Sequence, residues 1–221
     1  MRPWGHGLYA VTEPGLIATG DWATRVNAAI AGGAALIQYR DKADAEPHRL
    51  DQLRAIVTLC HAQGVPLIVN DDITLAAAVG ADGVHLGRDD ARLAAARQAL
   101  GAHAIIGVSC YNDLSRAVVA AEAGADYVAF GRFFPSHTKP HAPRADAEIL
   151  SLAKRRVNVP VVAIGGITAD NGAALIAAGA DLLAVIHGVF GQADVTAAAR
   201  SIAGLFDCGA IKPRPKAFSV K

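Results

Sequence analysis

Short apolar runs alternate with longer Ala-rich segments along almost the whole chain. One ten-residue phrase occurs four times, as AGGAALIQYR at 31–40, AVGADGVHLG at 78–87, EAGADYVAFG at 122–131 and AAGADLLAVI at 177–186. Each copy has an Ala-rich end typical of a helix, a glycine suited to a left-handed helix cap, and an apolar run typical of a strand. The phrase therefore predicts a helix followed by a strand at four places.

The intervals between the copies leave room for a second strand and a second helix in each repeat. Counted between the glycines Gly33, Gly80, Gly124 and Gly179, they are 47, 44 and 55 residues. Apolar runs rich in Val and Ile, which are typical of parallel strands covered on both faces, lie at 8–13, 65–71, 104–109 and 159–166. Helical patterns lie at 46–63, 91–100, 114–123, 145–156, 169–178 and 194–206.

Eight strands that alternate with helices predict an α/β protein with a (β/α)8 TIM barrel. An open, doubly wound parallel sheet shares the alternation, but the fourfold spacing favours closure. No Ser-rich or Pro-rich linker interrupts the pattern, so we expect one barrel domain over 1–208. The basic, Pro-containing segment 209–221 is expected to be a surface tail.

Composition narrows the range of partners. The chain has 21 Lys and Arg against 20 Asp and Glu, so a broad basic face for nucleic acid or an anionic membrane is not expected. No stretch reaches the ~18 apolar residues of a membrane span, and the first residues lack the layout of a signal peptide. We expect a cytoplasmic protein that binds small-molecule substrates, without nucleic acid or membrane. The sequence leaves the oligomeric state open, a homo-oligomer included.

The cysteines do not suggest a disulfide framework or a zinc ribbon. Cys60, Cys110 and Cys208 are an odd number with no CxxC spacing. A nucleophilic role for Cys110 is disfavoured because no His partner is discernible. The motifs HExxH, GxSxG and GxxxxGK[ST] are also absent, which argues against a zinc protease, an α/β-hydrolase and a P-loop NTPase.

Candidate chemistry gathers where the predicted strands end, which is where TIM barrels carry their active sites. The second strand ends in Gln38-Tyr39-Arg40-Asp41-Lys42. Since side chains alternate along a strand, Gln38, Arg40 and Lys42 share one face and bring two cations and an amide to the mouth. A solvated run of charges is the alternative.

Carboxylates follow the next two strands. Asn70 and Asp71 end the third strand, and Asp90 follows the fourth. Paired carboxylates without a His or Cys cluster suit Mg²⁺ rather than zinc. Alternatively, Asp71 and Asp90 cap the following helices, a role that Asp72 and Asp89 fit at least as well.

The remaining strand ends suggest sites for anions. The loop FGRFFPSHTKP brings Ser136, Thr138 and Lys139 together as two hydroxyls and an ammonium. The seventh strand ends in Gly165-Gly166 before a helix, at the usual phosphate pocket of such barrels, although close packing of the turn would explain the glycines as well. The fourth strand contains His85, which we interpret as a hydrogen-bonded wall residue, and no obvious catalytic base appears.

Six phrases, in this order, resemble the thiamine-phosphate synthase family: LIQYRDK, VNDD, GADGVHLGRDD, IIGVS, GADYVAFGRFFPSHTKP and VPVVAIGGIT. The resemblance runs from Leu8 to about Phe206, and it is specific because all six phrases are in register. It implies a Mg²⁺-dependent transferase of thiamine biosynthesis that couples a hydroxymethylpyrimidine diphosphate to a hydroxyethylthiazole phosphate. The products are thiamine phosphate and pyrophosphate.

The resemblance also implies roles for the residues at the mouth. Those implied to bind the pyrimidine diphosphate are Gln38, Tyr39, Arg40, Asp41, Lys42, Asn70, Ser109 and Lys139. Those implied to bind the thiazole phosphate are Ser136, His137, Thr138, Gly166, Ile186 and His187. The implied magnesium ligands are Asp71 and Asp90. The implied catalytic residues, which stabilise charge on the departing diphosphate, are Arg40, Lys42, Ser109 and Lys139.

Three positions depart from the commoner pattern of the family. His187 stands where Ser is usual, Ser136 where Thr is common, and Arg88 where Gln is usual. Three other activities remain as alternatives: a thiazole tautomerase relative, an isomerase or aldolase acting on a sugar phosphate, and a non-catalytic sensor of phosphorylated metabolites.

Overall fold

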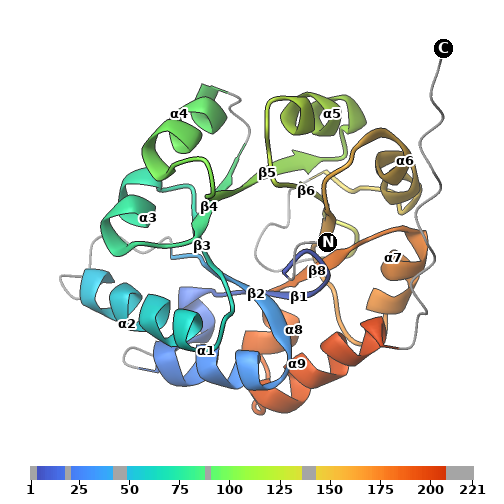
Figure 1. The fold of residues 1–221 in the computed structure, drawn as a ribbon. Coiled ribbons are helices and arrows are strands. Elements are labelled where there is room, and N and C mark those ends of the chain that lie inside the picture. Colours follow the sequence, from blue (N-terminus) through green and yellow to red (C-terminus); the bar gives the residue numbers. More distant parts are fainter. Residues whose placement is uncertain (1–3, 18–20, 42–48, 88–90, 136–142, 208–221) are drawn as a thin grey trace.

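Eight parallel strands form a closed barrel in the order of the chain, β1 to β8 (Figure 1). The computed structural model describes residues 4–17, 21–41, 49–87, 91–135 and 143–207. The strands are β1 Gly7–Val11, β2 Ala34–Tyr39, β3 Leu67–Asn70, β4 Gly83–Leu86, β5 Ile105–Tyr111, β6 Tyr127–Phe130, β7 Val161–Ile164 and β8 Leu182–Val185. Closure confirms the predicted TIM barrel and excludes the open sheet.

Helices surround the barrel on its outside (Figure 1). They are α1 Trp22–Ala31, α2 Arg49–Ala62, α3 Ile73–Val79, α4 Ala91–Leu100, α5 Leu114–Glu122, α6 Glu148–Arg156, α7 Gly172–Ala178, α8 His187–Phe190 and α9 Val195–Ala203. Two short 3-10 turns lie at Pro14–Leu16 and Gly204–Phe206. The four-residue helix α8 was not predicted. Among the described helices, none is both long and apolar enough to span a membrane.

The repeated phrase forms the turn from a helix into a strand, as predicted. Its four glycines all have positive φ, from 68° at Gly80 to 118° at Gly179, a backbone conformation that costs glycine little. Gly80 is the left-handed cap that ends α3, and Gly179 is the one that ends α7. The phrase thus ends each helix and starts the next strand by a local rule.

The aspartate of the phrase links neighbouring strands at the amino end of the barrel. Asp126 is buried, and its Oδ2 accepts hydrogen bonds from the backbone N–H of Ile106 at 2.9 Å and from Arg97 Nη2 at 2.6 Å. Asp82 and Asp181 accept equivalent backbone bonds from β3 and β7. These carboxylates stabilise the end of the barrel opposite to the carboxyl ends of the strands.

Two apolar layers form the core. One lies between the strands and the helices, and the other fills the barrel interior. The interior layer includes Trp4, whose ring meets that of Tyr127 edge to face, with centroids 6.1 Å apart. These side chains fill the amino-terminal half of the barrel, and the cavity lined by described residues lies above them, at the carboxyl ends of the strands.

Candidate active site

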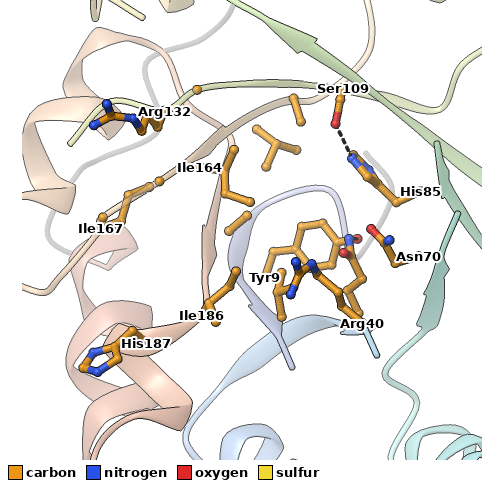
Figure 2. Close-up of a pocket in the computed structure, with 18 of the residues that line it drawn as sticks. Tyr9, Arg40, Asn70, His85, Ser109, Arg132, Ile164, Ile167, Ile186 and His187 are labelled. Atoms are coloured by element: carbon orange, nitrogen blue, oxygen red, sulfur yellow. Dashed lines mark hydrogen bonds between the residues drawn. The ribbon is translucent and has the colours of Figure 1, made fainter. Parts of the chain in front are cut away.

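A cavity of about 410 Å³ opens at the carboxyl ends of the strands, within the size range of small-molecule sites. Every strand contributes to its wall, and alternate residues face it, as in Tyr9 and Val11 or Gln38 and Arg40. Strands β1 to β5 and the residue after β2 supply polar side chains, which are Tyr9, Gln38, Arg40, Asn70, His85, Ser109 and Tyr111. Strands β6 to β8 supply apolar ones, and Figure 2 shows Ile164 and Ile186 across the cavity from Asn70 and His85.

Arg40 is a buried cation, with only 6% of its surface exposed. Its guanidinium forms an ion pair with Glu13, which follows β1. Thr12 holds the same stretch of backbone, because Arg40 N–H donates to Thr12 Oγ1 at 2.9 Å and the Thr12 hydroxyl donates to Arg40 O at 3.2 Å. A guanidinium has five N–H donors, so Arg40 can bind an anion in the cavity while it remains paired with Glu13.

The two adjacent aspartates after β3 have different tasks. Asp72 caps α3, because its Oδ1 accepts the backbone N–H of Leu75 at 2.8 Å. Asp71 lines the cavity instead and has a left-handed backbone with φ 62°. Asn70 Nδ2 donates to Asp71 Oδ2 at 2.8 Å, and Arg92 Nη1 lies 3.9 Å from Asp71 Oδ1. For Asp71, the cap role considered from the sequence is therefore excluded.

The carboxylate of Asp71 fits a shared Mg²⁺ site. Nearly half of its side chain is exposed, at 48%, so its oxygens are accessible from the mouth. In the described part of the chain no group of three or more His, Cys, Asp or Glu side chains could hold a metal. Mg²⁺ is commonly bound by one or two carboxylates together with substrate phosphates and water. One described carboxylate at the mouth is consistent with that arrangement, and Asp90 lies outside the described residues.

A chain of hydrogen bonds crosses the polar half of the barrel interior. Gln38 Nε2 donates to the Tyr9 hydroxyl at 2.6 Å, and the Tyr9 and Tyr127 hydroxyls lie 2.7 Å apart. The Tyr127 hydroxyl lies 2.9 Å from His85 Nδ1. On the other side of the ring, His85 Nε2 lies 2.8 Å from Ser109 Oγ, the bond dashed in Figure 2. Burial raises the pKa of both tyrosines well above 10. His85 is thus a hydrogen-bonded wall residue, as the sequence predicted.

The turns after β7 and β8 are tightly packed and also line the cavity. Gly166 has φ 64°, and a Cβ there would lie 2.2 Å from the carbonyl oxygen of Pro135. A Cβ on Gly188 would lie 2.6 Å from the carbonyl oxygen of Ile167. Close packing therefore requires both glycines. Gly166, Ile186 and His187 all line the cavity, as expected of residues at a phosphate site.

Two residues predicted to bind substrate lie away from the cavity. Tyr39 is buried, with its ring centroid 5.2 Å from that of Trp22 in α1, and its hydroxyl donates to Asp41 Oδ2 at 3.1 Å. The alternation that turns Gln38 and Arg40 inward turns Tyr39 toward the helices. Neither Tyr39 nor Asp41 is among the residues that line the cavity.

Six predicted site residues lie outside the described part of the chain, so their roles stay predictions. They are Lys42, Asp90, Ser136, His137, Thr138 and Lys139. The structure brings together the other predicted residues, which are Gln38, Arg40, Asn70, Asp71, Ser109, Gly166, Ile186 and His187.

Sequence reasoning missed several polar residues of the site. Tyr9 and Tyr127 lie in apolar runs, where an aromatic residue looks like ordinary core. Glu13 ends the run LYAVTE, so its position at a strand end was a usable signal. Arg132 also lines the cavity and comes two residues after the end of β6, where a cation could have been noticed by the same rule.

Comparison with known proteins identifies the family. The family model described as thiamine monophosphate synthase matches residues 8–189. The thiamine-phosphate synthase of Nitrosococcus oceani is 49% identical over 96% of this chain and 98% of that protein, and the one from Azoarcus is 54% identical over 91% and 97%. The thiamine phosphate pyrophosphorylase structure from Pyrococcus furiosus has a TM-score of 0.81 and 32% identity, covering 92% of this chain and 96% of that one. Since the family model spans most of the barrel and the relatives match nearly end to end, the chain belongs to the thiamine monophosphate synthase family.

Proposed function

We propose that the protein is a transferase of thiamine biosynthesis that joins 4-amino-2-methyl-5-(diphosphooxymethyl)pyrimidine to 4-methyl-5-(2-phosphooxyethyl)thiazole, or to its carboxylated form. The products are thiamine phosphate and pyrophosphate, and the carboxylated thiazole would in addition release its carboxyl group as carbon dioxide. The observation that carries this proposal is the match of the thiamine monophosphate synthase model to residues 8–189. Relatives of almost the same extent, about half identical, are named for this activity.

The two-sided cavity supports the proposal. Arg40, Asn70 and Ser109 offer hydrogen-bond donors on the polar side, which suits the diphosphate. Val162 and Ile164 on the other side can cover aromatic rings without leaving polar groups unpaired. The thiazole phosphate is proposed to bind at the turns after β7 and β8, together with the loop that contains Ser136, His137 and Thr138.

Asp71 and Asp90 are the proposed ligands of Mg²⁺. Of these two residues, Asp71 lies in the described part of the chain. Its carboxylate has the hard oxygen donors and the exposure that the ion requires. When bound, Mg²⁺ would neutralise charge on the diphosphate oxygens. Asn70 holds the Asp71 carboxylate by the bond at 2.8 Å and so orients it toward the cavity.

The reaction needs electrostatic stabilisation more than proton transfer. The bond between the methylene carbon of the pyrimidine and the diphosphate oxygen breaks, and its electron pair leaves with the diphosphate. The thiazole nitrogen then gives its lone pair to the carbocation and forms the new C–N bond. Arg40, Ser109, Lys42 and Lys139 stabilise the leaving charge, and a well-placed donor contributes about 3 kcal/mol. No proton moves at the reacting carbon, which agrees with the missing catalytic base.

The direct test is turnover by the purified protein with both substrates and Mg²⁺. Pyrophosphate release and thiamine phosphate are followed in parallel, and we expect equal amounts of the two products. Omission of either substrate should abolish both signals. Absence of thiamine phosphate with metal and both substrates present would refute the proposal.

The turnover assay, together with a calorimetric binding measurement, separates the alternative functions. A tautomerase would isomerise the thiazole carboxylate without releasing pyrophosphate. A sensor would bind the phosphorylated ligands in calorimetry without turning them over. An isomerase or aldolase would act on a sugar phosphate and ignore both proposed substrates.

A further inference from the structure

The hydrogen-bond chain beneath the cavity has a direction, which follows from counting its protons. Because Gln38 Nε2 donates to the Tyr9 hydroxyl, the single Tyr9 proton needs an acceptor elsewhere. Among the described residues the acceptor within reach is the Tyr127 hydroxyl, at 2.7 Å. Tyr9 therefore donates to Tyr127.

The same count continues to Ser109. Tyr127 accepts from Tyr9, so its own proton goes to His85 Nδ1 at 2.9 Å. A neutral imidazole that accepts at Nδ1 carries its proton on Nε2. His85 Nε2 then donates to Ser109 Oγ at 2.8 Å. Since Ser109 accepts this bond and lines the cavity, its own proton is available to a group inside the cavity.

The two tyrosines keep this direction because they remain protonated. Burial raises the pKa of Tyr9 and of Tyr127 well above the ordinary value of 10. Their rings are also fixed, since they pack edge to face with centroids 5.7 Å apart, and the His85 ring stacks on Tyr127 at 5.6 Å. Neither hydroxyl can turn away without leaving a buried polar group unpaired.

We propose that His85 is a positioning residue that holds Ser109 as a hydrogen-bond donor to the leaving diphosphate, with Tyr127 and Tyr9 setting the His85 tautomer. This rests on the proposed function, because the anion that receives the Ser109 proton is the diphosphate of the pyrimidine substrate. Charge on the leaving oxygen grows in the transition state, so a donor already aimed at it lowers the barrier more than it tightens binding.

Tyr127→Phe is the central variant, because it removes one hydroxyl and keeps the packed ring. Without that hydroxyl, His85 Nδ1 loses its donor and the imidazole can take either tautomer, so Ser109 is no longer aimed. Losing a donor costs about a hundredfold, and losing only its orientation should lower kcat by about tenfold with little change in KM. Val128→Ala is the matched control on the same strand, since Val128 is buried on the helix side and should lose stability without losing kcat.

A double variant separates positioning from a merely structural role. If Tyr127 acts through Ser109, then Tyr127→Phe combined with Ser109→Ala should be no slower than Ser109→Ala alone. His85→Gln keeps a donor amide near Ser109 and should retain more kcat than His85→Leu. A full tenfold further loss in the double variant, or wild-type kcat in Tyr127→Phe, would overturn the proposal.

A readout without turnover keeps this inference separate from the proposed function. Nitrogen chemical shifts of the His85 imidazole, assigned by comparison with His85→Gln, report its tautomer at neutral pH. We expect the Nε2–H form in the wild-type protein and a mixture of tautomers in Tyr127→Phe. The Nδ1–H form in the wild type would refute the proposed direction of the hydrogen bonds through His85, even if thiamine phosphate is made. The Nε2–H form without any turnover would refute the proposed function alone.

Discussion

Arg40 meets two demands with one side chain, because it is paired inside the protein and still faces the cavity. Its ion pair with Glu13 compensates the cost of burying a guanidinium, which an isolated charge could not avoid. The planar fork also matches phosphate oxygens in a way that an ammonium cannot.

Arg40→Ala should therefore lower kcat/KM by about a hundredfold or more. Arg40→Lys should recover only part of this loss, because lysine keeps the charge and loses the fork. Arg54→Ala is the matched control, since Arg54 is exposed on α2 and its guanidinium lies 3.6 Å from the carboxylate of Asp51, away from the cavity. Steady-state rates with both substrates measure the effect, and wild-type kcat/KM in Arg40→Ala would contradict the assigned role.

The neighbours Asp71 and Asp72 allow a comparison between a metal ligand and a helix cap. Asp71→Asn should raise the Mg²⁺ concentration needed for half-maximal rate by about tenfold or more, because the carboxylate charge is lost. Asp72→Ala should leave that concentration unchanged and lower the free energy of unfolding by about 1 kcal/mol, the cost of a lost cap. Magnesium titrations and urea unfolding of both variants test this. The opposite pattern would exchange the two roles.

At the scale of elements, the repeated phrase joins each helix to the next strand. Its glycine ends the helix, and its aspartate accepts the backbone N–H of the neighbouring strand, as Asp126 does while it pairs with Arg97 on α4. Three of the four copies contain this aspartate, and the first copy has Ala35 in its place. The phrase therefore supports the barrel from the end opposite to the cavity.

Asp126→Ala should destabilise the fold by about 3 kcal/mol, because Arg97 and the N–H of Ile106 would lose a buried partner. Asp82→Ala should cost less, since the Asp82 side chain is 31% exposed, against 9% for Asp126. Both variants should keep kcat at temperatures where they are folded, because the pairs lie far from the strand ends that bind substrate. Equal losses of stability would contradict the argument from burial.

At the scale of the whole molecule, the core limits the range of pH in which the protein is stable. Cys60 on α2 is fully buried, and burial, aided by the negative charge of Asp82, raises its pKa from 9.0 to about 12. The thiol of the unfolded chain ionises near pH 9, while the folded thiol stays protonated. Its contribution to stability is therefore complete below pH 9 and is lost as the pH rises toward 12.

In that window the free energy of unfolding should fall by about 1.4 kcal/mol per pH unit through this thiol. Tyr9 and Tyr127 add losses of the same sign above pH 10. Urea unfolding between pH 8 and pH 10 measures the slope, and Cys60→Ala should flatten it whatever its absolute stability. Parallel slopes for wild type and variant would show that Cys60 does not control the alkaline limit.

The sequence by itself determined the barrel and the ring of strand ends at which the polar residues gather. It could do so because helix caps, apolar runs and side-chain alternation are local rules that repeat along the chain. Those rules explain why all eight strands contribute to one cavity. They also explain why the cavity is lined by Gln38, Arg40, Asn70 and Ser109. The helix α8, the inward aromatic residues and the cavity residue Arg132 escaped them, and Tyr39 was wrongly expected to face the substrate.

Only the tertiary structure decided which polar groups meet. The hydroxyls of Tyr9 and Tyr127 are 118 residues apart in the chain, and Arg40 reaches its partner Glu13 across the β1–β2 edge. The sequence pattern does not distinguish a tyrosine whose hydroxyl forms a buried hydrogen bond from one that only fills space. Nor does a local rule decide whether Asp71 or Asp72 caps the following helix. Those assignments depend on closure of the barrel, which brings distant side chains within hydrogen-bond reach in a dry interior where every buried polar group needs a partner.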